Sequence, residues 1–253
     1  LNMSGQSAIP NSAWIILSIA VIAVSSGGIV LQEMSQVEPL LRASWRMQGT
    51  ALVLLPGFAY QCIRANGLSL SRNDFFLVAV SSLFLAMHFG SWVWSLDNTS
   101  LVHSLLFVNT HPLVLVALMP IMGQAVRKGH LAGVALGISG AILALKDVGD
   151  GGQVTLVGDF AAFIGAVTVV GYILSGRHLR SKRGMPIFVY AFPVSLGAGI
   201  WLSAASIIME GSSFSSIPPE GALLGWIDPH WLVWVAYLSI GPGLFGRIRQ
   251  IVC

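Results

Sequence analysis

Charged side chains are scarce in this sequence of 253 residues. Only 9% of the residues are charged, against 55% that are hydrophobic, whereas a soluble domain has about 25% charged residues. The chain therefore lacks the charged shell that keeps a globular protein in water. Its two cysteines, Cys62 and Cys253, form no metal-binding or redox spacing. No HExxH, Walker or dinucleotide-binding motif is present either.

Apolar stretches of nearly membrane-spanning length follow one another along the chain. A helix needs about 20 mainly apolar residues to cross about 30 Å of hydrocarbon, so we expect about eight spans. These are Ala13–Leu31, Leu40–Ile63, Phe75–Trp94, Leu101–Met122, Leu131–Leu145, Leu156–Gly176, Ile187–Met209 and Trp231–Gly246. The sequence therefore predicts an all-α, polytopic, multi-pass integral membrane protein.

The few charges are divided between alternate connections. Acidic residues such as Glu33, Glu38 and Asp97 lie in the odd connections, which hold almost no basic residue except Lys146. The even connections and the segment after the eighth span carry the basic residues Arg64, Arg72, Arg127, Lys128, Arg177, Arg180, Lys182, Arg183, Arg247 and Arg249. Because short loops rich in Lys and Arg are retained in the cytoplasm, this alternation indicates helices that cross a membrane in alternating directions.

Two parts of the chain resemble each other in the order and spacing of their spans. The first repeat is expected at residues 12–146 with five spans, and the second at 156–253 with about three. Because five is odd, the second copy must cross in the opposite sense. We therefore expect an inverted pair of five-helix repeats, the second incomplete.

Several segments carry a family resemblance. Met87–Ser100 and Leu106–Pro112 resemble the third and fourth helices of the EamA-type drug/metabolite transporter superfamily, and Gly133–Ala144 resembles its fifth. Gly158–Thr168, followed by Gly176–Arg180, is similar to the start of the second repeat of that family. The resemblance implies a secondary transporter that moves a small organic solute or metabolite by alternating access between two inverted repeats.

The same resemblance implies ten helices, of which this chain supplies eight at most. The last two helices of the second repeat are therefore expected to be missing. We expect the chain alone to be unstable or inactive, and two further spans to rescue it.

Polar residues within the spans mark a candidate substrate site, because such groups are costly in lipid and usually face a cavity or a partner helix. In the third span, His88 lies on a stripe of serines with Trp92 beside it. In the fourth, Asn109 and His111 lie just before Pro112 and on roughly opposite sides of the helix. The predicted substrate-binding residues are His88, Trp92, His111, Asn109, Arg46 and Tyr172. The alternative is that the histidines hydrogen-bond between helices and hold the bundle together.

Arg42 and Arg46 are four residues apart and share one face of the second span. Glu38, four residues earlier, could neutralise Arg42. A snorkelling, locally paired helix end is the favoured interpretation of the two arginines. Arg46 lies deeper and is the better candidate to attract an anionic group of a substrate.

The main alternative function is an intramembrane protease. Gly137-Ile-Ser-Gly140 matches the Gly-x-Ser-Gly of rhomboid serine proteases, with Ser139 as the nucleophile. The later histidines, His178 and His230, are not placed to act as its base. We therefore expect no enzymatic activity and no catalytic residue. A non-transporting truncated remnant is a third interpretation.

No acidic residue lies in the middle of a span, so proton coupling through a carboxylate is not expected. Protons would instead have to be carried by His88 or His111. No cofactor, metal or nucleic acid is expected. The expected partners are a small-molecule substrate and the lipid bilayer, with a homodimer left open. The plasma membrane, a plastid envelope and other internal membranes all fit the sequence.

The charge pattern predicts the orientation of the chain. The N-terminus and the loop from Arg177 to Arg183 should face the cytosol or its topological equivalent. Glycosylation tags or cysteine accessibility would measure this. A tag between Met209 and Trp231 that is modified only from the cytosolic side would contradict the predicted topology.

Overall fold

The fold is described here from a computed structural model, in which residues 11–64, 70–146, 154–215 and 217–245 are placed. The regular elements of these residues are all helices. They are α1 (Asn11–Glu33), α2 (Pro39–Arg64), α3 (Arg72–Asn98), α4 (Leu101–Val108), α5 (His111–Leu118), α6 (Lys128–Lys146), α7 (Leu156–Arg177), α8 (Ile187–Glu210) and α9 (Pro229–Leu238), with the π-helical turns η1 (His178–Lys182) and η4 (Ser239–Phe245) and the 3-10 turns η2 (Pro219–Gly221) and η3 (Gly225–Ile227). The predicted all-α polytopic membrane fold is confirmed.

Four helical segments in the described residues are long and apolar enough to cross a membrane. They are α3, α4 together with α5, α7 together with η1, and α8. Parts of α1 and α6 form shorter apolar helices. Each of the remaining predicted spans also coincides with a helix, α2 in one case and α9 with η4 in the other.

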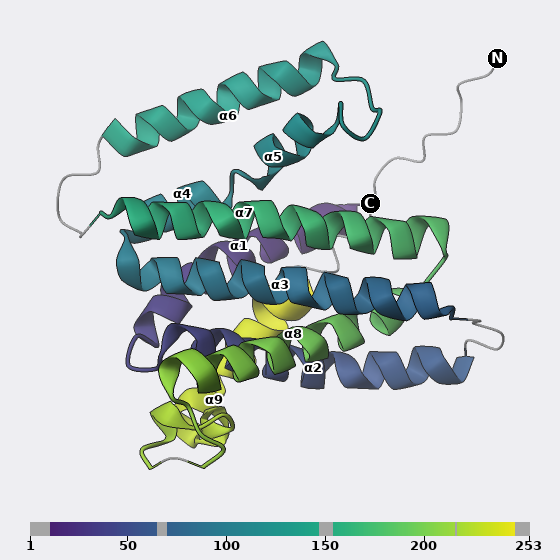
Figure 1. The fold of residues 1–253 in the computed structure, drawn as a ribbon. Helices are drawn as coiled ribbons and strands as arrows, with labels where there is room; N and C mark the ends of the chain where they lie inside the picture. The colour runs from purple at the N-terminus through teal and green to yellow at the C-terminus, as the bar shows by residue number, and fades with distance from the viewer. Residues whose placement is uncertain (1–10, 65–69, 147–153, 216, 246–253) are drawn as a thin grey trace.

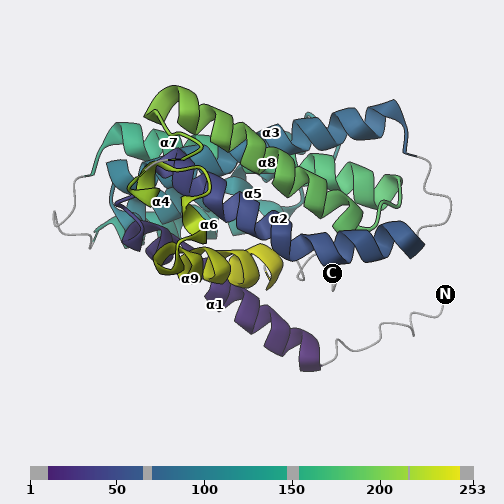
Figure 2. The same ribbon diagram turned by 90° about the horizontal axis from the view of Figure 1, so that it is seen from below.

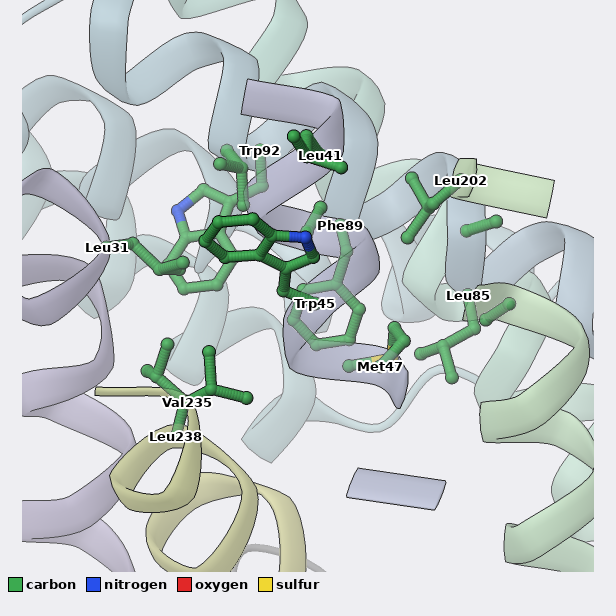
Figure 3. Packing of buried hydrophobic residues seen from close by; sticks show 14 of the residues in the cluster. Leu31, Leu41, Trp45, Met47, Leu85, Phe89, Trp92, Leu202, Val235 and Leu238 are labelled. Atoms are coloured by element: carbon green, nitrogen blue, oxygen red, sulfur yellow. The ribbon is translucent and has the colours of Figure 1, made fainter. Parts of the chain in front are cut away.

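The helices form a bundle with α3 at its centre. α3 packs along α7 on one side and along α8 on another, and α2 runs along α8 (Figure 1). α9 packs on α2, and α1 packs on η4 and on α3; both lie below α2 in the view turned by 90° (Figure 2). The core between these helices contains Trp45, Phe89 and Trp92, with Val235 and Leu238 of α9 packed against it (Figure 3).

The two ends of the bundle differ in charge. The starts of α2 and α7 and the ends of α3 and α8 meet at one end, joined by bonds such as Thr99 Oγ1 to Asp159 Oδ1 at 2.7 Å. At the other end, Arg183 binds Asp74, and the backbone N–H of Phe188 donates to Gln61 Oε1 at 2.9 Å. We call these the acidic end and the basic end. The described helix ends beside the first, third, fifth and seventh connections therefore lie at one end, and those beside the second and sixth lie at the other, as the charge pattern predicts.

Arg42 joins three helices at the acidic end. Its side chain is fully buried and forms an ion pair with Asp97 at the end of α3. Its second terminal nitrogen donates to the carbonyl oxygen of Leu31 in α1 at 2.6 Å. The ion pair of Arg42 is thus made with Asp97 and not with Glu38, and Arg46 is only 6% exposed. The expectation of a snorkelling helix end was therefore wrong for both arginines.

A carboxylate from another helix caps the start of α2. Glu210, the last residue of α8, accepts hydrogen bonds from the backbone N–H groups of Leu40 at 2.7 Å and Leu41 at 3.0 Å. Ser206 donates to the same carboxylate at 2.8 Å. The first N–H groups of a helix have no partner within it, and an anion there also interacts favourably with the helix dipole. Glu210 therefore fixes the relative position of α2 and α8.

The predicted fourth span is broken. α4 ends at Val108 and α5 begins at His111, with Pro112 in its first turn, where the missing N–H of proline costs nothing. Beyond the break, α5 still packs on α7, whereas α6 lies away from the rest of the bundle (Figure 1). α6 packs on α5, and most of its described side chains are exposed.

Replacing Glu210 tests this packing of α8 on α2. Glu210→Ala removes the acceptor of two helix-terminal N–H groups and should lower the free energy of unfolding by about 1–2 kcal/mol, as loss of a helix N-cap does. Thermal unfolding of the purified protein in detergent measures the change. The exposed Glu38, in the connection before α2, supplies the control variant Glu38→Ala. Equal stability of the two variants would show that the cap contributes nothing.

Candidate functional site

A buried arginine lies over two aromatic rings inside the bundle. The guanidinium carbon of Arg46 is 4.3 Å from the centroid of the Phe89 ring and 5.6 Å from that of the Trp92 ring. Arg46 is 6% exposed, Phe89 9% and Trp92 7%. Because Phe89 and Trp92 are three residues apart, they lie on one face of α3 and present both rings to α2.

The depth of Arg46 in the bundle makes its charge costly in free energy. Arg46 lies seven residues after the start of α2, or about 10 Å along the helix axis from the acidic end towards the middle of the bundle. A charged side chain costs about 2.5–3.5 kcal/mol at the centre of a membrane helix. A desolvated cation–π contact returns about 2 kcal/mol. The two rings thus offset much of the cost of holding a cation at this depth.

Trp92 also has a polar group that no described residue satisfies. Its indole N–H is buried and has no hydrogen-bond acceptor in the described part of the chain. Leaving a buried donor unsatisfied costs about 1–3 kcal/mol, so an unpaired donor is informative about function. Figure 3 shows Trp92 close to Phe89 and Trp45 in the bundle interior.

His88 completes one side of this cluster and connects it to α7. Its ring stacks on Trp92, with centroids 6.1 Å apart and planes 18° apart. Its Nδ1 lies 2.8 Å from the carbonyl oxygen of Gly165 in α7. A Cβ at Gly165 would lie 3.3 Å from the His88 carbonyl oxygen, so a glycine there allows α7 to approach α3 closely.

The break between α4 and α5 separates the two predicted residues beside Pro112. His111 is half-buried at the start of α5 and lies within electrostatic range of His88, as Arg46 does. Asn109 is exposed, and its side-chain amide donates to the carbonyl of Leu105 one turn earlier, at 2.7 Å. The structure therefore brings Arg46, His88, Trp92 and His111 into one region and leaves Asn109 outside it. We call those four residues, with Phe89, the α2–α3 cluster.

Tyr172 lies outside the α2–α3 cluster. Its ring stacks on Tyr190 of α8, with centroids 6.1 Å apart. Both tyrosines line a cavity of about 330 Å³ at the basic end, together with residues of η1. Tyr172 is therefore not part of the α2–α3 cluster, although it was predicted on the same grounds.

Other polar residues of the spans hold helices together. Ser81 shares a hydrogen bond of 2.6 Å with Tyr190, and Ser95 shares one of the same length with Ser104. His103 Nδ1 lies 3.0 Å from Asp159 Oδ2, which ties α4 to α7. For these residues the structure favours the packing interpretation of polar groups in spans.

The described part of the chain contains no catalytic arrangement for the alternative function, an intramembrane protease. Ser139 is exposed on α6, the helix that extends away from the bundle, and it forms no hydrogen bond with a described histidine. His178 begins η1 at the basic end, and His230 lies at the start of α9. The general base that such a serine requires is therefore not beside it.

Sequence reasoning missed two residues of functional interest. Phe89, the nearest ring to Arg46, could have been found from its spacing of three residues before Trp92 on the same face of α3. Asp159 was not singled out from the sequence, although it bonds both Thr99 and His103. Its partners lie 60 and 56 residues away in the sequence, so no local pattern indicates them.

Comparisons with known proteins identify the family. The model of the EamA-like transporter family matches residues 11–146, more than half of the chain. A solved crystal structure, described only as that of a protein, aligns with a TM-score of 0.56 and 18% sequence identity, over 95% of this chain and 84% of that one. At that identity it shows a shared fold alone. None of the curated proteins matches the chain.

The family match covers the first predicted repeat and includes α1 to α6. It accords with a multi-pass membrane protein that transports small solutes, and with the expectation that the chain is not an enzyme. The chain belongs to the EamA-like transporter family.

Proposed function

We propose that this protein is a secondary transporter that moves a small organic solute across its membrane by alternating access, with the solute bound at the α2–α3 cluster. The observation that carries the proposal is the buried guanidinium of Arg46 over the Phe89 and Trp92 rings, next to an indole N–H without an acceptor. A buried ionisable side chain in a membrane bundle is typical of a functional site, and the unsatisfied indole N–H of Trp92 adds a free donor beside it.

The chemistry of the cluster favours a solute with an anionic group and an apolar body. The guanidinium of Arg46 offers charged donors to a carboxylate or phosphate, and the Trp92 N–H adds a neutral donor. The rings of Phe89 and Trp92 form an apolar wall. A carbonyl can only accept, so the Nδ1 of His88 donates to Gly165. In the neutral ring, Nε2 of His88 is then an acceptor that faces away from that bond.

The two ends of the bundle are closed to different extents, which supports alternating access. Bonds from Arg42, Glu210 and Asp159 join α1, α2, α3, α7 and α8 at the acidic end. Trp45 and Trp226 add bonds between α2 and the connection before α9. The described cavity of about 330 Å³ lies at the basic end instead. We interpret this conformation as closed towards the acidic end.

The packing of the helices also supports the proposed inverted repeats, at residues 12–146 and 156–253. Suppose that α1 is exchanged with α7, α2 with α8, and α3 with α9 plus η4. Three helix contacts then correspond to helix contacts that the structure also contains. The α3–α7 contact becomes the η4–α1 contact, and the α3–α8 contact becomes those of α9 and η4 with α2. The α2–α8 contact maps onto itself. A two-fold relation of this kind is common in transporters with inverted repeats.

Replacing Trp92 by Phe separates binding from packing. Trp92→Phe removes the indole N–H and keeps an aromatic ring under Arg46. If the solute accepts that hydrogen bond, the KM for uptake should rise about tenfold, since a bond of this kind contributes about 1.4 kcal/mol. The stability of the solute-free protein should stay unchanged or rise, because an unsatisfied buried donor is lost. Uptake of labelled carboxylates, phosphates and amino acids into proteoliposomes provides the assay, and unfolding in detergent the stability.

His88→Gln and His111→Gln should lower uptake several-fold while the melting temperature holds, because glutamine keeps hydrogen-bonding atoms but not the imidazole geometry. His103→Gln serves as the matched control, since His103 bonds Asp159 outside the cluster. His103→Gln should lower the melting temperature of the protein and leave its uptake nearly unchanged. Unchanged uptake in Trp92→Phe, His88→Gln and His111→Gln alike would refute binding at the cluster.

A further inference from the structure

The cavity at the basic end is a second site, separate from the α2–α3 cluster. It lies between the last turn of α7, the π-helical turn η1 and the start of α8, and has a volume of about 330 Å³. Its lining includes Tyr172, Gly176, Arg177, Arg180, Ser181 and Tyr190. A π-helical turn widens the helix locally, and such turns are frequent at functional sites.

The walls of the cavity are held in place by bonds among their own helices. The hydroxyl of Tyr190 shares a hydrogen bond of 2.6 Å with Ser81 of α3 and donates to the carbonyl of Tyr172 at 3.4 Å. The stacked rings of Tyr172 and Tyr190 join α7 to α8 at this wall. A Cβ at Gly176 would lie 2.7 Å from the Tyr190 hydroxyl, so a side chain there would displace this wall. The cavity is thus formed before any ligand binds.

The charge of this cavity is positive. Arg177 and Arg180 line it, and none of its described lining residues is acidic. Asp74 is the acidic residue that the described chain places at the basic end. It forms an ion pair with Arg183, whose Nε and Nη2 donate to its two oxygens at 3.0 and 2.8 Å. These bonds raise the pKa of Arg183 above its usual value. Asp74 is therefore paired with Arg183, which does not line the cavity.

We propose that this cavity binds a phosphate-bearing anion through Arg177 and Arg180, with the hydroxyls of Ser181 and Tyr172 as further donors. Paired guanidinium groups match the geometry of phosphate oxygens and form charge-assisted hydrogen bonds with them. The ligand is either the headgroup of an anionic lipid, which is abundant in cytoplasmic leaflets, or a soluble phosphate compound. The site does not depend on the α2–α3 cluster or on transport.

The test compares two double variants that lose the same charge. Arg177→Gln/Arg180→Gln removes the two cavity arginines. Arg72→Gln/Lys182→Gln removes two exposed cations of the same end that do not line the cavity. Both are purified as the full chain, and folding is checked by thermal unfolding. If the cavity double variant unfolds, the single variant of the exposed Arg177 replaces it.

Two probes distinguish the sources of the anion. Inorganic phosphate is titrated against the protein in a neutral detergent, and phosphatidic acid adducts are counted by native mass spectrometry after release from nanodiscs of phosphatidylcholine and phosphatidic acid. We expect at least one probe to bind the wild type and to bind the cavity variant about tenfold more weakly, with the control variant within about threefold of wild type. Binding of phosphate indicates a soluble ligand, and binding of the lipid alone indicates a headgroup. Equal losses in both variants, or no binding of either probe to the wild type, would overturn the proposal.

Discussion

The arrangement of the first three helices depends on the ion pair and hydrogen bond of the fully buried Arg42 guanidinium. A charge without water must be paired within the protein, because an unpaired one costs several kcal/mol. Arg42 lies near the start of α2, at the positive end of the helix dipole, where a cation is least favourable. Asp97 of α3 and the carbonyl of Leu31 in α1 compensate it. The positions of α1 and α3 relative to α2 follow from this requirement, and the carboxylate of Glu210 adds α8 in the same way.

This constraint gives the bundle its asymmetry. The acidic end combines buried ion pairs, helix caps and tryptophan hydrogen bonds, whereas the basic end contains a preformed cavity and repelling cations. The α2–α3 cluster lies between the two ends, with its cation held by aromatic rings. In the proposed alternating access, the acidic side would open when the polar bonds at that end break.

The sequence predicted the class of the fold well, because hydropathy and loop charge act on each span separately. Helices appear at all eight predicted spans, and the described helix ends beside the odd connections lie opposite those beside the second and sixth connections. The partner of Arg42 could not be predicted in the same way. A spacing of four residues suggested Glu38, but the true partner, Asp97, lies 55 residues further on. Local spacing says nothing about which helix ends meet in space.

The candidate site was predicted in part, for a similar reason. Span polarity selected Arg46, His88, Trp92 and His111, which the bundle brings into one region. The same criterion selected Asn109, which faces outward where α4 ends, and Tyr172, which lines the cavity at the basic end. Polarity shows that a residue must face protein or water, but only the packing of helices decides which neighbour it meets.

Distances between spin labels at the two ends test alternating access most directly. One pair joins Gln36 to Ser215 at the acidic end, and another joins Asn73 to Lys182 at the basic end, in a chain with Cys62 and Cys253 replaced by serine. Double electron–electron resonance in lipid nanodiscs would compare this protein with its Asp97→Asn variant, which loses the ion pair of Arg42. The variant should show longer distances at the acidic end together with shorter ones at the basic end. Unchanged distances at both ends, or longer distances at both, would contradict alternating access.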